Sequence, residues 1–249
     1  ATGMVINDLM YKPWDHYVTS VPHPFVAIAT DDAITDAFDL LAGEPFESPM
    51  LPFGGIEQLA WSPDSRTVAY TCRKKTGRDY AISTDSDIFL FDLDSRSTRN
   101  LCKPEGYKAP ELDPTRSLAS QQGEADLNLG YDQNPSFSPD GKYIAWSSME
   151  RDGYESDRTR LCVMELATGR KRYVTETFES GVNQFLWAEN SKRLYFTGVW
   201  HGKTNIYQTD LEGRVKALTD DVADYPLAGL TADGRSLIAT RQSMSRPAE

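Results

Sequence analysis

Several features that would point to particular classes of protein are missing from this chain. Its 249 residues include only three cysteines, an odd and widely spaced set that fits neither a disulfide framework nor a zinc knuckle. No apolar run approaches the roughly 20 residues that span a bilayer, so a membrane is not an expected partner. The net charge of -11 repels phosphate backbones, so nucleic acid is not expected either.

Motifs of enzyme active sites are equally scarce. No Gly-x-Ser-x-Gly nucleophile elbow occurs, and the nearest match, residues 234–238, has isoleucine in place of the second glycine. The three histidines, His16, His23 and His201, lie in loop-like sequence without the context of a catalytic triad, so we expect them to be solvated. The sequence therefore predicts no catalytic residue in this chain.

Metal and cofactor motifs are absent as well. Neither a phosphate-binding glycine loop nor an HExxH motif occurs. The acidic pieces Asp85-Ser86-Asp87 and Asp220-Asp221 lack the ligand spacing of a calcium loop, and we expect solvated turns there. Cys72 and Cys162 each lie in an apolar, strand-like run, where we expect them to act as small buried hydrophobes.

A repeated pattern is the main feature that the sequence does have. A short apolar strand, a tight polar turn and an alternating strand recur at residues 58–70, 134–146, 184–196 and 227–239. In the turn, proline pre-sets φ, aspartate accepts backbone hydrogen bonds, and glycine, where present, takes positive φ. A second hairpin follows each of the first three copies, so each repeat comprises four antiparallel strands.

The spacing of the repeats predicts an architecture. Their anchors Phe137, Trp187 and Leu230 are about 43 to 50 residues apart, and four strands at such a period are typical of β-propeller blades. We predict an all-β fold, a single partial propeller over residues 1–249. The predicted pieces are part-blades at 1–45 and 223–249, blades at 54–101, 130–176 and 180–219, and an insertion at 102–129.

The repeats resemble the Ser-Pro-Asp-Gly units of TolB-like and prolyl-oligopeptidase-type propellers. Residues 132–146 and 149–158, the latter with Arg-Asp-Gly-Tyr at 151–154, are similar to propellers of acylaminoacyl and dipeptidyl peptidases. Residues 54–64 and 70–75 look most like bacterial dipeptidyl-peptidase-V-type enzymes. The repeat unit itself is typical of the propeller class rather than of peptidases, so the narrower resemblance rests on these stretches.

The resemblance implies a role in proteolysis. Members of the prolyl oligopeptidase family pair the propeller with a C-terminal α/β-hydrolase domain that carries a Ser-Asp-His triad. The propeller limits access to short peptides. The implied function is substrate gating for a serine peptidase, with the peptide and the hydrolase domain as partners, no cofactor, and a chain that is inactive alone. Resemblance to the bacterial dipeptidyl-peptidase-V group favours the periplasm over the cytoplasm.

Long connections between second and third strands suggest where a substrate would bind. They lie at about residues 10–23, 73–85 and 150–160, and such connections emerge on one face of a propeller. They are either solvated extensions or a face that packs on the hydrolase domain and reaches the substrate. In the second case Glu150, Asp152 and Glu155 could bind a free α-amino group by charge-assisted hydrogen bonds, with Tyr154 as a wall.

Two further expectations stay open. A non-catalytic TolB-like propeller that serves as a protein-interaction scaffold is the alternative function. A propeller glycosidase or lactonase has less support, because no carboxylate cluster repeats at the inner-strand positions. Because a propeller buries its edge strands by closing the ring, part-blades near Pro24 and Thr240 predict self-association through an exposed edge.

Overall fold

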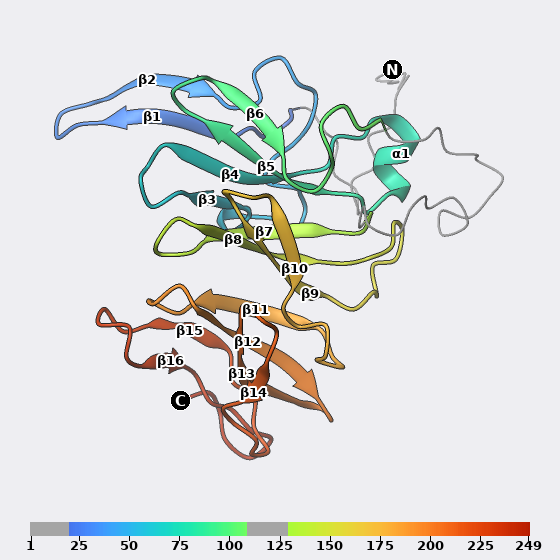
Figure 1. Ribbon diagram of the computed structural model, residues 1–249, viewed down its shortest axis with the longest axis vertical. Coiled ribbons are helices and arrows are strands. Elements are labelled where there is room, and N and C mark those ends of the chain that lie inside the picture. The colour runs from blue at the N-terminus through green and yellow to red at the C-terminus, as the bar shows by residue number, and fades with distance from the viewer. Residues whose placement is uncertain (1–19, 109–128) are drawn as a thin grey trace, which may run out of the picture.

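The computed structural model describes residues 20–108 and 129–249. Antiparallel strands form five sheets that are stacked one after another along the long axis of the molecule (Figure 1). Three sheets have four strands and two have two. The stack confirms the all-β propeller predicted from the repeats.

The sheets follow the chain in order, without crossovers. The first sheet comprises β1 (Phe25–Ala29) and β2 (Ile34–Asp39). The 3-10 helix η1 (Ile56–Gln58) leads into the second sheet, which comprises β3 (Leu59–Trp61), β4 (Thr67–Cys72), β5 (Asp87–Asp92) and β6 (Ser97–Asn100). The third sheet comprises β7 (Asp132–Phe137), β8 (Tyr143–Ser148), β9 (Arg160–Glu165) and β10 (Arg170–Tyr173).

The last two sheets continue the same order. The fourth comprises β11 (Val182–Trp187), β12 (Arg193–Trp200), β13 (Lys203–Asp210) and β14 (Val215–Ala217). The fifth comprises β15 (Leu227–Leu230) and β16 (Leu237–Ala239). The first strands of successive sheets, β3, β7, β11 and β15, contact one another, so they form the inner side of the arc, as in a propeller.

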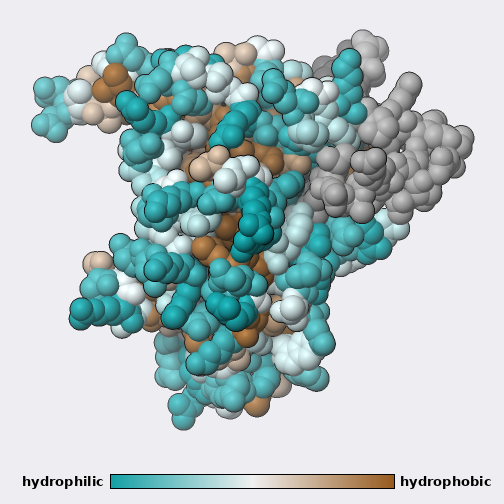
Figure 2. Space-filling model, viewed as in Figure 1, coloured by the Kyte–Doolittle hydropathy of each residue, from teal (hydrophilic) through white to brown (hydrophobic). Residues whose placement is uncertain are grey.

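The core lies in the seams between sheets, because each middle strand buries both of its faces. In β8, Ile144 and Trp146 pack into the cluster shared with the second sheet, whereas Ala145 packs into the cluster shared with the fourth. Alternation of side chains along a strand produces this division. Figure 2 shows apolar side chains in these seams, while hydrophilic residues cover most of the visible surface.

The repeated turns have the chemistry expected from their sequence. The Ser138 hydroxyl donates to Asp140 Oδ1 at 2.7 Å, and the same carboxylate oxygen accepts from the backbone N–H of Lys142 at 3.1 Å. Gly141 takes a φ of +69°, while Ser65 takes a φ of +60° at the equivalent position of the second sheet. The turn therefore holds its shape even where glycine is absent.

Two local features differ from the sequence prediction, and part of that prediction concerns residues that the structure does not describe. Helix α1 (Gly77–Ile82) interrupts the connection between β4 and β5, which the repeat did not predict. Cys102 and Lys103, assigned to the insertion, are buried against the second sheet. Residues 1–19 of the predicted part-blade 1–45 and most of the insertion lie outside the described residues. Among the described helices, none is long and apolar enough to cross a membrane.

The β1–β2 sheet leaves apolar side chains exposed. Phe25, Ile28 and Ile34 are each more than half exposed, and the hairpin projects from one end of the stack (Figure 1). Self-association through this edge stays a prediction, as do the domain boundaries.

Candidate functional site

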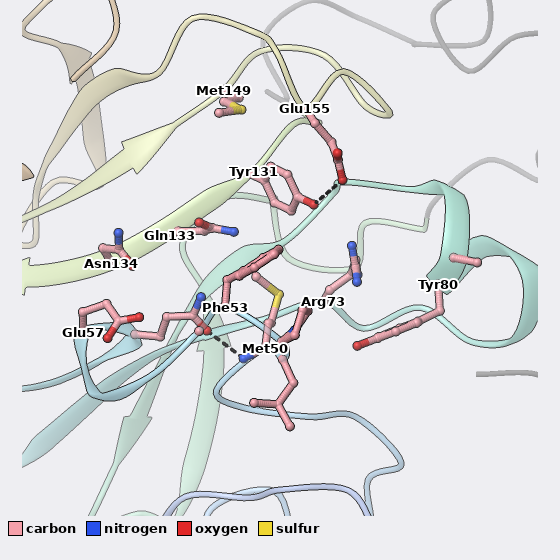
Figure 3. A pocket seen from close by; sticks show the side chains of 15 residues that line it. Met50, Phe53, Glu57, Arg73, Tyr80, Tyr131, Gln133, Asn134, Met149 and Glu155 are labelled. Atoms are coloured by element: carbon pink, nitrogen blue, oxygen red, sulfur yellow. Dashed lines mark hydrogen bonds between the residues drawn. The ribbon is translucent and has the colours of Figure 1, made fainter. Parts of the chain in front are cut away.

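A cleft of about 630 Å³ lies where the second and third sheets meet. It opens on the face from which the connections between second and third strands emerge, because it includes the residues directly after β4 and β8. Figure 3 shows its side chains. The lining residues are Met50, Leu51, Pro52, Phe53, Gly54, Glu57, Gln58, Arg73, Tyr80, Ala81, Tyr131, Gln133, Asn134, Met149 and Glu155.

One wall of the cleft is the loop 50–58, which the fold holds in a fixed shape. The buried side chain of Gln58 accepts the backbone N–H of Met50 at 2.7 Å, and the N–H of Gly54 donates to the Met50 carbonyl at 2.8 Å. A Cβ at Gly54 would lie 2.4 Å from that carbonyl oxygen, so the turn requires glycine. The loop carries Phe53, which is 80% exposed, at the cleft.

The opposite wall comes from the third sheet and carries a carboxylate. Tyr131 Oη donates to Glu155 Oε1 at 3.3 Å (Figure 3). Burial raises the pKa of Tyr131, so the phenol stays protonated and available as a donor at neutral pH. Glu155 itself is exposed and can reach a ligand.

Arg73 supplies a positive charge on the second-sheet side of the cleft. It follows β4 directly, and its Nη1 donates to the backbone carbonyl of Ser83 at 2.8 Å. Its guanidinium lies 4.4 Å from the ring centroid of Tyr80. Tyr80 is buried in α1 and its hydroxyl donates to Glu47. Arg73 is therefore fixed at the cleft by contacts with the α1 connection.

The four residues predicted to bind substrate have different environments. Glu155 lines the cleft, and Tyr154 lines an adjoining cleft of about 370 Å³ that shares Arg73, Ala81 and Glu155 with the first. Glu150 lies apart, with its Oε2 3.7 Å from Arg160 Nη1.

Asp152 has a different environment from the other three. Its side chain is buried, and its Oδ1 accepts from the Ser83 hydroxyl at 2.8 Å and from the Thr84 N–H at 2.7 Å. These bonds tie the hairpin after β8 to the α1 connection. Asp152 therefore fixes the shape of the cleft from behind, whereas Glu155 faces it.

The prediction of a solvated turn at Asp85-Ser86-Asp87 is wrong. Lys103 Nζ lies 2.8 Å from Asp85 Oδ1 and 2.6 Å from Asp87 Oδ1, and Asp85 also pairs with Lys75 at 2.8 Å. The side chains of Lys103 and Asp85 are only 4% and 6% exposed. The lysine that neutralises the carboxylates is 16 residues away from Asp87 in sequence, so a local reading of the acidic piece missed it.

This ion cluster continues into the seam with the third sheet. Ligand atoms of Asp87, Cys102 and Asp132 lie within 4.8 Å of one another. Burial raises the pKa of Asp132 to about 6, and the Trp146 Nε1–H donates to its Oδ1 at 2.8 Å. Burial alone would lower the pKa of Lys103, but Asp87 and Asp85 raise it above its ordinary value. Protein donors already serve Asp87 and Asp132, so the arrangement is an ion-pair cluster rather than a metal centre.

The predictions for cysteines and histidines have mixed outcomes. Cys72 and Cys162 are free and buried, as predicted, and burial raises the pKa of Cys72 to about 12. His23 is not solvated, because its half-buried ring places Nδ1 2.7 Å from Asp39 Oδ2. His201 is exposed at the β12–β13 turn, as expected, whereas His16 lies outside the described residues.

Sequence comparison finds close relatives over the whole chain. Dipeptidyl-peptidase 5 of Porphyromonas gingivalis is 44% identical over 248 residues, which cover 99% of this chain and 33% of the relative. Dipeptidyl-peptidase 5 of Porphyromonas endodontalis is 42% identical over 249 residues, 100% of this chain and 32% of the relative. The chain therefore spans about a third of the length of these relatives. No family model matches it.

Solved structures share the fold. Porphyromonas gingivalis dipeptidyl peptidase 4 superposes with a TM-score of 0.55 and 12% identity, over 90% of this chain and 37% of that one. TolB from Acinetobacter baumannii gives a TM-score of 0.51 and 20% identity, over 87% and 44%. At these identities the likeness concerns the propeller fold alone.

The narrower assignment, to peptidase propellers, rests on the sequence relatives. The resemblance to prolyl-oligopeptidase-type propellers that the repeats implied is matched by 44% identity with a protein named dipeptidyl-peptidase 5. The chain has the β-propeller fold and is homologous, along its whole length, to a segment that makes up about one third of each of these two dipeptidyl-peptidase 5 relatives.

Proposed function

We propose that this chain is the propeller of a serine dipeptidyl peptidase, where it admits short peptides and binds their free N-terminus in the cleft between the second and third sheets. The carboxylate of Glu155, exposed at the cleft beside Tyr131, is the observation that carries the proposal. A protonated α-amine forms charge-assisted hydrogen bonds with a carboxylate, stronger than those between neutral groups.

Glu155 is the best placed of the predicted acidic residues. Asp152 already accepts hydrogen bonds in a buried position, and Glu150 lies beside Arg160 away from the cleft. Arg73, which lines the same cleft as Glu155, can donate to a peptide carbonyl while the carboxylate holds the amine. Opposite charges in one cleft suit a dipeptide, which has an amine at one end and carbonyl oxygens along it.

The same face has the character of a docking surface for the catalytic domain. Exposed apolar side chains lie on the second-to-third-strand connections of the second and third sheets and at the end of β12 in the fourth: Ile82, Tyr154, Val199 and Trp200. Exposed apolar groups at adjoining positions favour an interface with another domain. An α/β-hydrolase domain packed there would cover the cleft and make it the entrance to an active site.

Binding of dipeptide amides to the chain tests the amine anchor. We expect Leu-Ala-amide to bind more tightly than N-acetyl-Leu-Ala-amide by calorimetry, and Glu155→Gln to abolish the difference. A hydrogen bond to a charged group contributes about 1.5–3 kcal/mol, which is about tenfold or more in Kd. Glu150→Gln is the matched control, because it removes the same charge from the same hairpin outside the cleft.

Two outcomes would contradict the proposal. Equal affinity for the free and acetylated peptides would exclude the amine anchor. Absence of peptide binding together with binding of a folded protein partner to this face would favour the TolB-like scaffold instead.

A further inference from the structure

The inner strand β7 has an irregular backbone where it borders the cleft. Asn134 takes a φ of +59° directly before Pro135, and a bulge interrupts the pairing with β8 between Gln133 and Ser136. Positive φ is uncommon for residues other than glycine, and it stores strain that is often found at functional sites. Bulges next to such sites change the direction in which a side chain points.

The bulge brings two consecutive side chains to the same cleft. In a regular strand, neighbouring side chains point to opposite faces. Gln133 and Asn134 nevertheless both line the cleft, together with Tyr131, which directly precedes β7 (Figure 3). The distorted backbone therefore places two adjacent amides on this wall.

Asn134 differs from the residues at the same position of the neighbouring repeats. It is the first residue of its repeat, where the repeats on either side begin with Gln58 and Gln184. Gln58 accepts the backbone N–H of Met50 at 2.7 Å, and Gln184 accepts that of Leu227 at 3.1 Å, so both amides hold backbone in place. The half-buried amide of Asn134 has no hydrogen-bond partner among the described residues, so it is released from this structural role.

The chemistry of these amides indicates the kind of ligand that they would bind. Gln133 is also half-buried, and its amide likewise has no partner within the part of the chain that the structure describes. A side-chain amide both donates and accepts hydrogen bonds, and each peptide group of an extended chain offers one N–H and one C=O. Two adjacent amides therefore match a peptide backbone better than they match a charged or an apolar ligand.

The spacing along β7 separates these amides from the proposed amine anchor. Tyr131, which donates to Glu155, lies two residues before Gln133. A strand rises about 3.3 Å per residue, which places Gln133 about 7 Å from Tyr131 along the strand. A ligand that contacts Glu155 and both amides must therefore extend over more than one peptide group.

We propose that Gln133 and Asn134 bind the backbone of an extended peptide, whatever its side chains, on the inner side of the arc. This inference rests on the proposed function, because it takes a peptide to be the ligand of the cleft. It adds a second contact to the amine anchor and makes the affinity depend on unmodified peptide groups.

The test alters the backbone of a peptide without changing its side chains. Calorimetry on the full chain compares Ala-Ala-Ala-Ala-amide with analogues in which lactic acid replaces the second, third or fourth residue in turn. Each replacement converts one peptide bond into an ester, which removes an N–H donor and keeps the methyl group. We expect at least one ester to bind roughly three- to tenfold more weakly, as loss of a neutral hydrogen bond predicts.

Variants of the protein identify the groups that bind the backbone. Asn134→Gly removes one amide while glycine still accepts the positive φ, and Gln133→Met removes the other with a side chain of similar length. Both variants should reduce the difference between the amide and ester peptides. Gln184→Met is the matched control, because it removes the amide from the same position of the next repeat, where it serves Leu227, and should leave that difference unchanged.

The outcomes separate this inference from the amine anchor. If every ester binds as tightly as the amide peptide, the backbone is not bound and the inference is wrong, whether or not N-acetylation weakens binding. A difference that persists in both Asn134→Gly and Gln133→Met would also overturn it, because other groups would then bind the backbone. If these variants remove the difference while N-acetylation has no effect, backbone binding is confirmed and the amine anchor is wrong.

Discussion

Replacement of Lys103 by alanine should destabilise the protein far more than loss of a surface lysine. The ammonium group lies 2.8 Å from Asp85 and 2.6 Å from Asp87, on a side chain that is 4% exposed. Without it, Asp85 still pairs with Lys75 at 2.8 Å, whereas Asp87 keeps a neutral donor, Asn100 Nδ2 at 2.7 Å. Removal of one partner from a buried ion pair costs about 3–5 kcal/mol, because the remaining charge stays desolvated. We expect the free energy of unfolding to fall by about that amount.

Lys142→Ala provides the matched control. Its side chain is 75% exposed, and Nζ lies 3.9 Å from Asp140 Oδ2. Exposed pairs of this kind contribute about 0–1 kcal/mol. Urea unfolding at neutral pH, followed by tryptophan fluorescence, measures both variants on the same scale.

The pH dependence gives an independent check on the cause. Burial raises the pKa of Asp87, and Lys103 opposes that rise, so the variant should raise the pKa further. A carboxyl whose pKa is higher in the folded than in the unfolded state stabilises the fold when protonated, and this stability is lost as pH rises through the folded pKa. The loss of unfolding free energy in Lys103→Ala should therefore become smaller as pH falls from neutral towards about 4, near the pKa of an unfolded carboxyl. Equal losses in the two variants, or a deficit that does not change with pH, would refute the assignment of Lys103 as the neutralising cation.

Two other predictions concern the seam and the cleft. The pKa of Asp132 is raised to about 6, so its ionisation opposes folding. The contribution of Asp132 to the free energy of unfolding should be complete below about pH 4 and fall by about 3 kcal/mol as pH rises to 6, at about 1.4 kcal/mol per unit. Asp132→Asn should flatten this dependence of the unfolding free energy on pH, as measured by urea titrations. Gly54→Ala should lower the free energy of unfolding by roughly 1–3 kcal/mol through overpacking, because its Cβ would meet the Met50 carbonyl. Gly229→Ala should lower it less, because Gly229 has open space around it. Thermal unfolding compares the two variants, and equal losses would contradict the fixed shape of the loop 50–58.

The propeller could be predicted from the sequence because its signals are local. Each turn uses residues within a few positions of one another, as Ser138 and Asp140 do, and strand alternation divides Ile144 from Ala145 without knowledge of their partners. Helix α1 escaped prediction because six residues in a connection carry no repeated pattern.

The site was only partly predictable, because its contacts join distant segments. Glu155 was a candidate from the hairpin that resembles peptidase propellers, but Asp152 in the same hairpin binds Ser83 and Thr84, 68 or 69 residues away. Phe53 lies directly before the stretch 54–64, and Arg73 lies within the stretch 70–75, both of which resemble bacterial dipeptidyl-peptidase-V-type enzymes, but neither residue was predicted to line a site. The acidic residues at 85 and 87 were misread because Lys103 is near them only in the folded chain.

The location of the cleft between two sheets has a thermodynamic consequence. Its walls belong to different structural units, with Phe53 and Arg73 on one and Tyr131 and Glu155 on the other. A ligand that contacts both walls cross-links the units, and mass action then stabilises the joint by an amount that grows with ligand concentration. By reciprocity, any change that ionisation of Asp132 makes in the binding free energy equals the change that binding makes in the free energy of that ionisation. A group in the seam that changes how firmly the two sheets are held together would therefore change the affinity of such a ligand without touching it.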